Sequence, residues 1–122
     1  MAKRRMISKD IFMTQEFMSM SLSAQALYSW LVLFADDEGF VGIPDRVTVM
    51  IGAEESALDE LINSGFVIRF KTGVAVIEKW EEFNKISSKR LIRTKFLSEQ
   101  RQYHKMKLMG SNKKVLSLTA EN

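Results

Sequence analysis

Three consecutive carboxylates, Asp36-Asp37-Glu38, form the longest acidic run in the sequence, and such a group can bind a divalent cation. The EF-hand spacing fails, because counting from Asp36 places Val47 at position 12, where a bidentate acid is required. A carboxylate-based nuclease site would need further acids together with a Lys or His near the phosphate. The only histidine, His104, lies in a basic segment far along the chain. These acids therefore do not predict a metal or catalytic site.

A structural role is the prediction for the same three acids. Acidic residues are turn-prone, and Gly39 lets the chain reverse directly after them. Their charge would lie beside the C-terminal end of an apolar helix, which is mildly unfavourable, so we expect a compensating cation such as Arg46. The chain has no cysteine, and no nucleophile–base pair or metal-ligand cluster is visible. The sequence therefore predicts no enzyme, no cofactor and no metal.

Charge is distributed unevenly along the 122 residues. Residues 35–82 carry four basic and eleven acidic side chains, whereas residues 83–122 carry ten basic and two acidic ones. A C-terminal third with this excess predicts a polyanionic partner. A solvated face or a flexible tail is the structural alternative.

The candidate DNA contacts are basic side chains with hydroxyl neighbours, a combination that suits phosphate oxygens. They lie in the N-terminal arm, in a predicted hairpin and in the run that follows it. The set is Lys3, Arg4, Arg5, Arg46, Arg69, Lys71, Thr72, Lys85, Lys89, Arg90, Arg93 and Lys95. A duplex is favoured over a single strand, because only Phe96 and Tyr103 offer stacking surfaces among these cations.

The elements that must position these side chains begin with a long helix after Ser23, a residue typical of an N-cap. Leu27, Trp30, Leu31 and Phe34 fall at helical spacing, and the opposite side is also apolar. A helix that is apolar nearly all round predicts a buried, central position, with Trp30 in the core. Trp80 and Phe83 are further expected core residues.

Shorter elements follow the acidic run. Residues 40–43 read as a small strand, Pro44 opens a short helix that Gly52 ends, and a second helix spans about 54–64. Residues 66–70 and 74–77 read as a hairpin, and a last helix from 95 to 109 would be capped by Thr94.

This order of elements predicts an α+β winged helix-turn-helix, in which the small strand joins the hairpin as a third antiparallel strand. The expected domain spans residues 1–97 with a basic arm at 1–10, followed by a basic C-terminal helix and flexible tail at 98–122. The second helix of the pair would present Ser56, Asp59, Glu60 and Asn63 for base readout. Because acids repel phosphates, docking of a protein partner is an equal alternative for that helix.

The stretches "MAKRRMISKDIF", "LSAQALYSWLVLFADDEGFVG", "LDELINSGFVIRF" and "VAVIEKWEEFNKI" together resemble the N-terminal domain of phage replisome organisers, replication initiation proteins related in layout to DnaD-type primosome proteins. The resemblance covers about residues 1–97. It implies a winged-helix domain that binds double-stranded DNA at a phage origin, in the cytoplasm of a bacterial host. Longer members carry a further C-terminal region that recruits helicase-loading machinery, and this chain is expected to be a fragment or a short relative.

Two other functions stay open at this point. One is a transcriptional regulator with the same fold, and the other is a protein-interaction module that docks a helicase loader through its acidic helix. A homodimer is a further alternative, with residues 94–109 as the segment for self-association. The longest apolar run, Ala26–Ala35, is too short for a membrane span.

Overall fold

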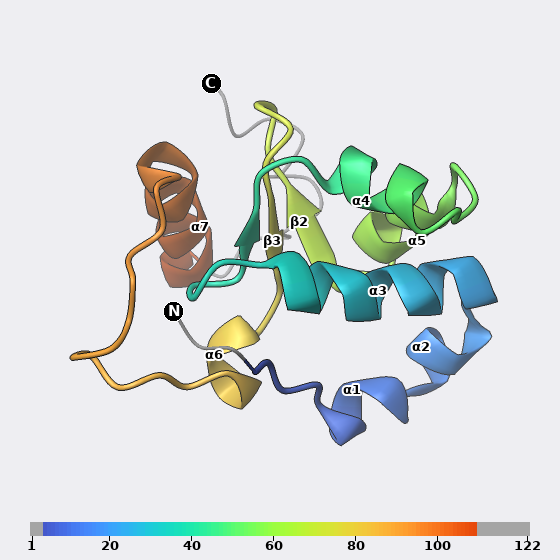
Figure 1. Ribbon diagram of the computed structural model, residues 1–122, viewed down its shortest axis with the longest axis horizontal. Helices are drawn as coiled ribbons and strands as arrows, with labels where there is room; N and C mark the ends of the chain where they lie inside the picture. Colours follow the sequence, from blue (N-terminus) through green and yellow to red (C-terminus); the bar gives the residue numbers. More distant parts are fainter. Residues whose placement is uncertain (1–3, 110–122) are drawn as a thin grey trace.

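A three-stranded antiparallel sheet lies between two layers of helices in the computed structural model, which describes residues 4–109 (Figure 1). In chain order the elements are α1 (Lys9–Phe12), α2 (Gln15–Ser19), α3 (Leu22–Phe34), β1 (Phe40–Val41), α4 (Pro44–Met50), α5 (Ala57–Asn63), β2 (Val67–Arg69), β3 (Ala75–Ile77), α6 (Trp80–Phe83) and α7 (Leu97–Met109). The prediction of an α+β fold with a small three-stranded antiparallel sheet is confirmed. The predicted DNA contact at Lys3 and the predicted tail after residue 109 lie outside the described residues.

The sheet has the strand order β1-β3-β2, so the two-residue strand β1 pairs with the second strand of the hairpin as expected. Phe40 lies opposite Val76 in one pair, and Val67 lies opposite Ile77 in the other. At the hairpin turn, the backbone N–H of Phe70 donates to the carbonyl oxygen of Val74 at 2.8 Å. Both predicted runs form strands, each shorter than its apolar stretch.

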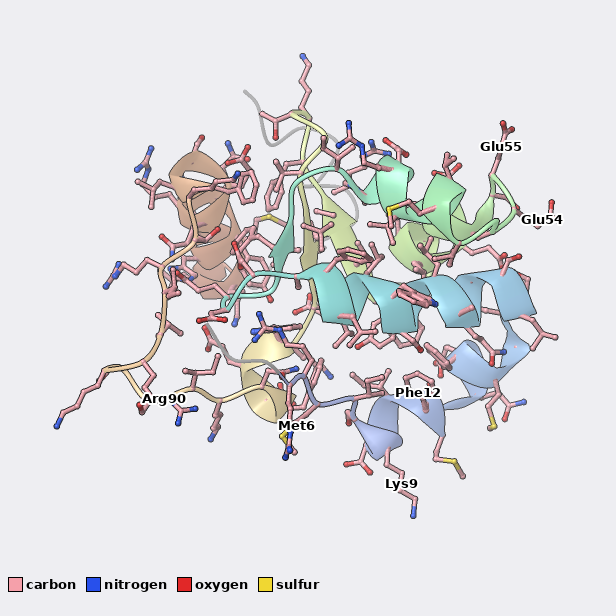
Figure 2. The ribbon with its side chains drawn as sticks, viewed as in Figure 1. Met6, Lys9, Phe12, Glu54, Glu55 and Arg90 are labelled. Carbon is pink, nitrogen blue, oxygen red and sulfur yellow. The ribbon has the colours of Figure 1, made fainter. Side chains whose placement is uncertain are left out.

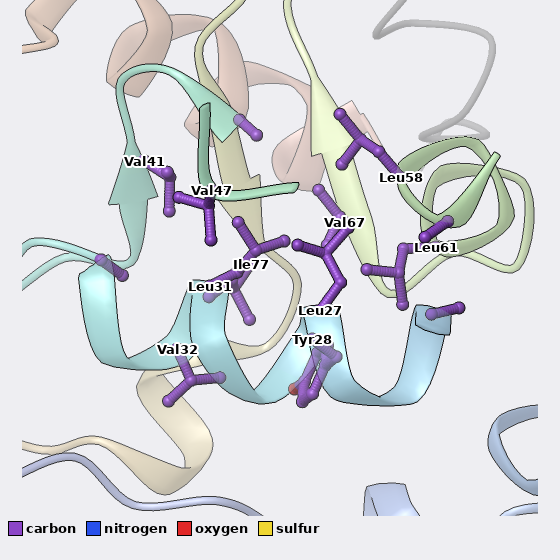
Figure 3. Close-up of a cluster of buried hydrophobic side chains, with 14 of the residues drawn as sticks. Leu27, Tyr28, Leu31, Val32, Val41, Val47, Leu58, Leu61, Val67 and Ile77 are labelled. Atoms are coloured by element: carbon purple, nitrogen blue, oxygen red, sulfur yellow. The ribbon is translucent and has the colours of Figure 1, made fainter. Parts of the chain in front are cut away.

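Alternate residues of the strands point into two separate cores, as the period of a strand requires. On one face, Val41, Val67 and Ile77 pack against α3, α4 and α5 (Figure 3). On the other face, Phe40 and Val76 belong to a second cluster that also contains Ile68, Phe70, Val74, Tyr103 and Met106. Because both faces are covered, the strands read as almost continuous apolar runs in the sequence.

Helix α3 starts earlier than predicted and is buried on one side only. Its N-cap is Ser21, whose Oγ accepts from the backbone N–H of Ala24 at 3.1 Å, whereas Ser23 lies inside the helix. Ala24, Leu27, Tyr28, Leu31 and Val32 are buried.

The expectation of a helix that is buried all round, with Trp30 in the core, is wrong. Trp30, Leu33 and Phe34 are 43%, 55% and 47% exposed. The sheet and the neighbouring helices pack against the other side of α3, and within residues 4–109 none of the elements buries this side. Trp80, by contrast, is 2% exposed, so its predicted core position is confirmed.

Helix α7 forms the second helical layer rather than a detached extension. Tyr103 and Met106 are buried against the sheet, and the Tyr103 hydroxyl donates to Oε1 of Glu78 at 3.0 Å. Burial, followed by the nearby Glu78 carboxylate, raises the pKa of Tyr103, so this phenol stays a neutral donor. The described part of 98–122 therefore packs together with the segment before residue 97.

The predicted cap of α7 is also corrected. The helix begins at Leu97, and the Thr94 hydroxyl accepts from the backbone N–H of Phe96 at 3.2 Å. Thr94 lies ahead of the helix and binds the acidic run instead, as described below.

Among the helices of residues 4–109, none has both the length and the apolar character that crossing a bilayer requires.

Candidate nucleic-acid interface

The acidic turn, defined as Asp36, Asp37 and Glu38, accepts hydrogen bonds on all six of its carboxylate oxygens. Asp36 Oδ1 accepts from the backbone N–H groups of Glu38 and Phe40, at 2.9 and 3.0 Å, and so closes the turn that leads into β1. Its Oδ2 accepts from the Thr94 hydroxyl at 2.5 Å. These oxygens are occupied by protein donors, which is the arrangement of a structural site rather than of an open metal site.

Asp37 joins the N-terminal arm to the segment before α7. One carboxylate oxygen pairs with Arg5 Nη2 at 3.0 Å, and the other accepts from the backbone N–H of Ile92 at 3.0 Å. The Arg5 guanidinium also donates to the carbonyl oxygen of Ala35 at 2.8 Å and lies 5.3 Å from the ring centroid of Trp80. The Trp80 indole N–H in turn donates to the Asp37 carbonyl oxygen at 2.9 Å.

Glu38 completes the connection. It accepts from the backbone N–H of Thr94 at 2.8 Å and from the side-chain amide of Gln100 on α7. Gly39 follows with φ 91°, and a Cβ at this position would lie 2.6 Å from Cγ of Trp80. The turn is thus tightly packed as well as fully bonded, which the sequence indicated only as a chain reversal.

The electrostatics of Asp37 agree with this role. Burial by itself would raise the pKa of the Asp37 carboxyl, but the Ile92 N–H and the Arg5 guanidinium together outweigh burial and lower it. The carboxylate therefore stays ionised in the folded protein. Within residues 4–109, no group of three or more His, Asp or Glu side chains is placed to hold a metal ion.

The cation that compensates the acidic turn is Arg5, so the expectation that Arg46 would do so is wrong. The Arg5 side chain is only 4% exposed and is committed to Asp37, so it cannot reach a phosphate and leaves the DNA-contact set. Arg4 and Arg46 are exposed. The sequence distance explains the error, since Arg5 lies 32 residues before its partner.

Exposed cations gather on the segment from Lys85 to Lys107, here called the basic surface. It contains five of the predicted DNA contacts, Lys85, Lys89, Arg90, Arg93 and Lys95. It also contains three cations outside the predicted set, Arg101, Lys105 and Lys107, and all eight are exposed. The one acid between residues 83 and 109 is Glu99, which is buried and accepts from the Thr72 hydroxyl at 2.6 Å. No exposed carboxylate in this segment therefore offsets the eight positive charges.

The linear run of basic residues that ends at Lys95 does not indicate the three cations of α7. Tyr103 and Met106 turn inward, so Arg101 and Lys105, spaced i and i+4, fall together on the other side of α7. Helical spacing in the sequence could have found this pair.

The predicted hairpin contacts are partly engaged with other residues. Arg69 pairs with Asp45 of α4 at the surface, and Thr72 is bound to Glu99. Lys71 is exposed at the turn. Because Thr72 bonds to α7, the hairpin tip lies beside the N-terminal end of the basic helix (Figure 1).

Helix α5 belongs to an acidic part of the surface. Glu60 is one of the residues predicted to read bases or dock a partner. Its carboxylate accepts two hydrogen bonds from Ser21, one from the Ser21 hydroxyl at 2.5 Å and one from the Ser21 backbone N–H at 3.1 Å. These two bonds lower the pKa of Glu60 and hold the N-terminal end of α3. Asp59 and Asn63 are exposed on α5, and Ser56 is exposed directly before it.

The loop before α7 and the exposed acids beside α5 lie at opposite ends of the longest axis. Figure 2 shows Arg90 at the tip of the loop before α7, whereas Glu54 and Glu55 project from the far end, next to α5. The acidic end, defined as Glu54, Glu55 and Asp59, has no Lys or Arg between residues 50 and 66. Helix α5, the helix predicted to read bases, therefore lies among acids that repel the phosphates of DNA.

A cleft of about 490 Å³ lies between three segments of the chain: residues 8–16, residues 64–66 after α5, and residues 78–83 around the start of α6. Its lining has four acids and one lysine, which disfavours a phosphate-bearing ligand. The lining residues are Ser8, Asp10, Ile11, Thr14, Glu16, Ser64, Gly65, Phe66, Glu78, Lys79, Glu82 and Phe83.

Comparison of the chain with protein-family models, with curated proteins and with solved structures gave no match.

Proposed function

We propose that this chain is a non-enzymatic, DNA-binding winged-helix domain that holds duplex DNA through its phosphates. The observation that carries the proposal is the basic surface, in which eight exposed Lys and Arg side chains follow one another from Lys85 to Lys107 without an exposed acid. Neutralising phosphates releases counterions, so a dense row of cations binds duplex DNA with little dependence on sequence.

The order of elements supports this assignment. A helix, a short strand, two short helices and a hairpin follow one another in the arrangement of a winged helix, and β1 pairs with the hairpin. Helices α4 and α5 form the helix-turn-helix of this proposal, with Gly52 at φ 72° in the turn between them. The hairpin of β2 and β3 is the wing.

The resemblance to phage replisome organisers makes the proposal more specific. In this proposal the domain binds origin DNA in the bacterial cytoplasm, on behalf of a phage or prophage, and helps to recruit replication proteins. A transcriptional regulator of the same fold would have an equivalent surface. Tighter binding to origin fragments than to promoter fragments of the same genome distinguishes the two, because phosphate contacts contribute equally to both.

A second function is favoured by a different observation. Glu54, Glu55 and Asp59 are exposed at one end with no cation among them, which suits a basic protein surface. A helicase loader or another replication protein that docks there would leave the basic surface free for DNA.

The test is the salt dependence of duplex binding, measured by fluorescence anisotropy with a labelled duplex of about 20 base pairs. With about six phosphates neutralised, affinity should fall by about 10³-fold between about 50 and 200 mM salt. A single strand of the same sequence serves as the comparison and should bind more weakly. An affinity that does not change with salt would sink the proposal.

A further inference from the structure

We propose that α7, rather than the helix-turn-helix helix α5, is the element that enters the major groove of DNA. The proposal rests on the proposed function, because it takes DNA as the partner and assigns which helix reads it. Its basis is the division of α7 into a buried face and a cationic outer face.

The buried face of α7 consists of Glu99, Tyr103 and Met106, which contact the hairpin and the sheet. Residues at i, i+3 and i+4 share a helix face, so Arg101, His104 and Lys105 lie together on the outer side. All three are exposed. The outer side thus has two permanent cations and an imidazole, and the only acid of the helix is turned inward.

The dimensions of α7 suit a groove. Thirteen residues at 1.5 Å per residue give a length of about 20 Å. The major groove of B-DNA is about 12 Å wide and about 8.5 Å deep, which admits one α-helix. Arg and Lys are the side chains that pair with O6 and N7 of guanine, so Arg101 and Lys105 have the chemistry for base contacts.

Helix α5 is the weaker candidate on the same criteria. It has seven residues, its first turn contains Asp59 and Glu60, and Glu54 and Glu55 lie just before it. Helices α5 and α7 cover opposite faces of the sheet (Figure 1). A duplex seated on α7 therefore stays away from the acidic end, whereas one seated on α5 meets it directly.

The surroundings of α7 provide contacts to the flanking phosphates. The loop before the helix contains Lys89, Arg90 and Arg93, and Lys95 lies 5.4 Å from the ring centroid of Phe96 at the start of the helix. On the other side, the Thr72–Glu99 hydrogen bond holds the hairpin tip, with Lys71, next to α7. The helix would thus be flanked by cations from two different segments.

The first experiment compares two double variants that remove the same charge. Arg101→Ala with Lys105→Ala removes two exposed cations from α7. The control, Lys9→Gln with Lys79→Gln, removes two exposed cations from α1 and from the residue before α6, and neither is a candidate DNA contact. Binding of each variant to a guanine-rich duplex of about 20 base pairs is measured at fixed salt. We expect a loss of at least tenfold for the α7 pair and less than threefold for the control pair.

Thermal unfolding of both variants, followed by circular dichroism, should match that of the parent protein, because all four side chains are exposed. If the parent protein binds the duplex and the α7 pair binds within twofold of it, the inference fails and the proposed function stands. If the control pair loses as much affinity as the α7 pair, the loss reflects net charge rather than the position of α7, and the inference also fails. If the parent protein binds no duplex, the proposed function itself fails.

A second experiment tests for the groove itself. Replacing every guanine of the duplex with 7-deazaguanine removes the N7 acceptors from the major groove and leaves the phosphates unchanged. The parent protein should lose about tenfold in affinity, and the Arg101→Ala, Lys105→Ala variant should lose less than twofold. Equal affinity of the parent protein for the two duplexes would show that α7 contacts phosphates only and would overturn the groove assignment.

Discussion

The acidic end and the acidic turn both contain three carboxylates, yet they differ in what the fold does with them. At the acidic end, Glu54, Glu55 and Asp59 are exposed. In the acidic turn, every carboxylate oxygen accepts a hydrogen bond, and Asp37 is paired with a buried arginine. The carboxylates of the acidic end contribute to the electrostatic field around the protein. Those of the acidic turn are bonded to donors of the protein itself.

The basic surface completes this comparison, because it resembles the acidic end in exposure and opposes it in sign. With the two at opposite ends of the long axis, the protein has an electric polarity that would orient it during approach to a polyanion. The contrast shows that the role of a charged run depends on the residues that lie next to it in the folded protein. Four measurements test this contrast, and the change expected is greatest in the first and least in the last.

The largest effect is expected for Asp37→Asn, which leaves the Arg5 guanidinium buried without its anionic partner. Removing one member of a buried ion pair costs about 3–5 kcal/mol in free energy of unfolding. Urea unfolding at neutral pH measures the loss. The matched control is Asp45→Asn, which breaks the exposed pair with Arg69 and should cost about 0–1 kcal/mol. Equal losses for the two variants would contradict the distinction between a buried, paired carboxylate and an exposed one.

Charge reversal at the centre of the basic surface comes next. Replacing Lys89, Arg90 and Arg93 with Glu should weaken duplex binding about 100-fold, which is about 2.7 kcal/mol at 1.36 kcal/mol per tenfold. Because these residues contact phosphates in the proposal, the loss should be the same for unrelated sequences. Anisotropy titrations with three different duplexes measure it. Loss of binding to one duplex alone would give these residues a role in sequence readout instead.

Acid should weaken the fold through Asp37. Its folded-state pKa is lowered, so its contribution to stability is fully present above the ordinary Asp pKa of about 3.9 and is lost as the pH falls through the folded value. The stability difference between the parent protein and Asp37→Asn should therefore shrink as the pH falls from 7 to below 4. Urea unfolding of both proteins over this range measures it, and a constant difference would contradict the assignment.

The smallest effect is expected at the acidic end. Glu55→Lys with Asp59→Lys changes the local charge by four units, but it should alter duplex affinity less than threefold at physiological salt. The acidic end and the basic surface are separated by the long axis, and the Debye length is about 8 Å. A tenfold gain in affinity would show instead that bound DNA passes near α5.

Local signals in the sequence predicted most of the elements. Glycines after the helices, the helical spacing of apolar residues and the hairpin turn all lie within a few positions of what they specify. The side of α3 that stays exposed was not predictable in the same way, because Trp30 and Trp80 look alike without knowledge of which neighbours arrive.

The candidate site was less predictable, because its organising contacts are distant in sequence. Ile92 and Thr94 lie 55 and 58 residues from the carboxylates that they bind, and Arg5 lies 32 residues from Asp37. Helix α7 has only a thin apolar stripe, so its packing on the sheet was not apparent. Once that packing is known, the identity of its outer residues follows from helical spacing alone.

The acidic turn also sets how far the chain can be shortened. Its hydrogen bonds bring position 5 and positions 92–100 to the same few atoms, so the chain between them is closed into a ring by non-covalent contacts. A piece cut after residue 97 would lose the Gln100 contact and uncover the sheet face that holds Phe40 and Val76. A piece begun after Arg5 would leave Asp37 buried without its cation. The N-terminal arm and α7 should therefore unfold together, because loss of either one weakens the acidic turn that holds the other.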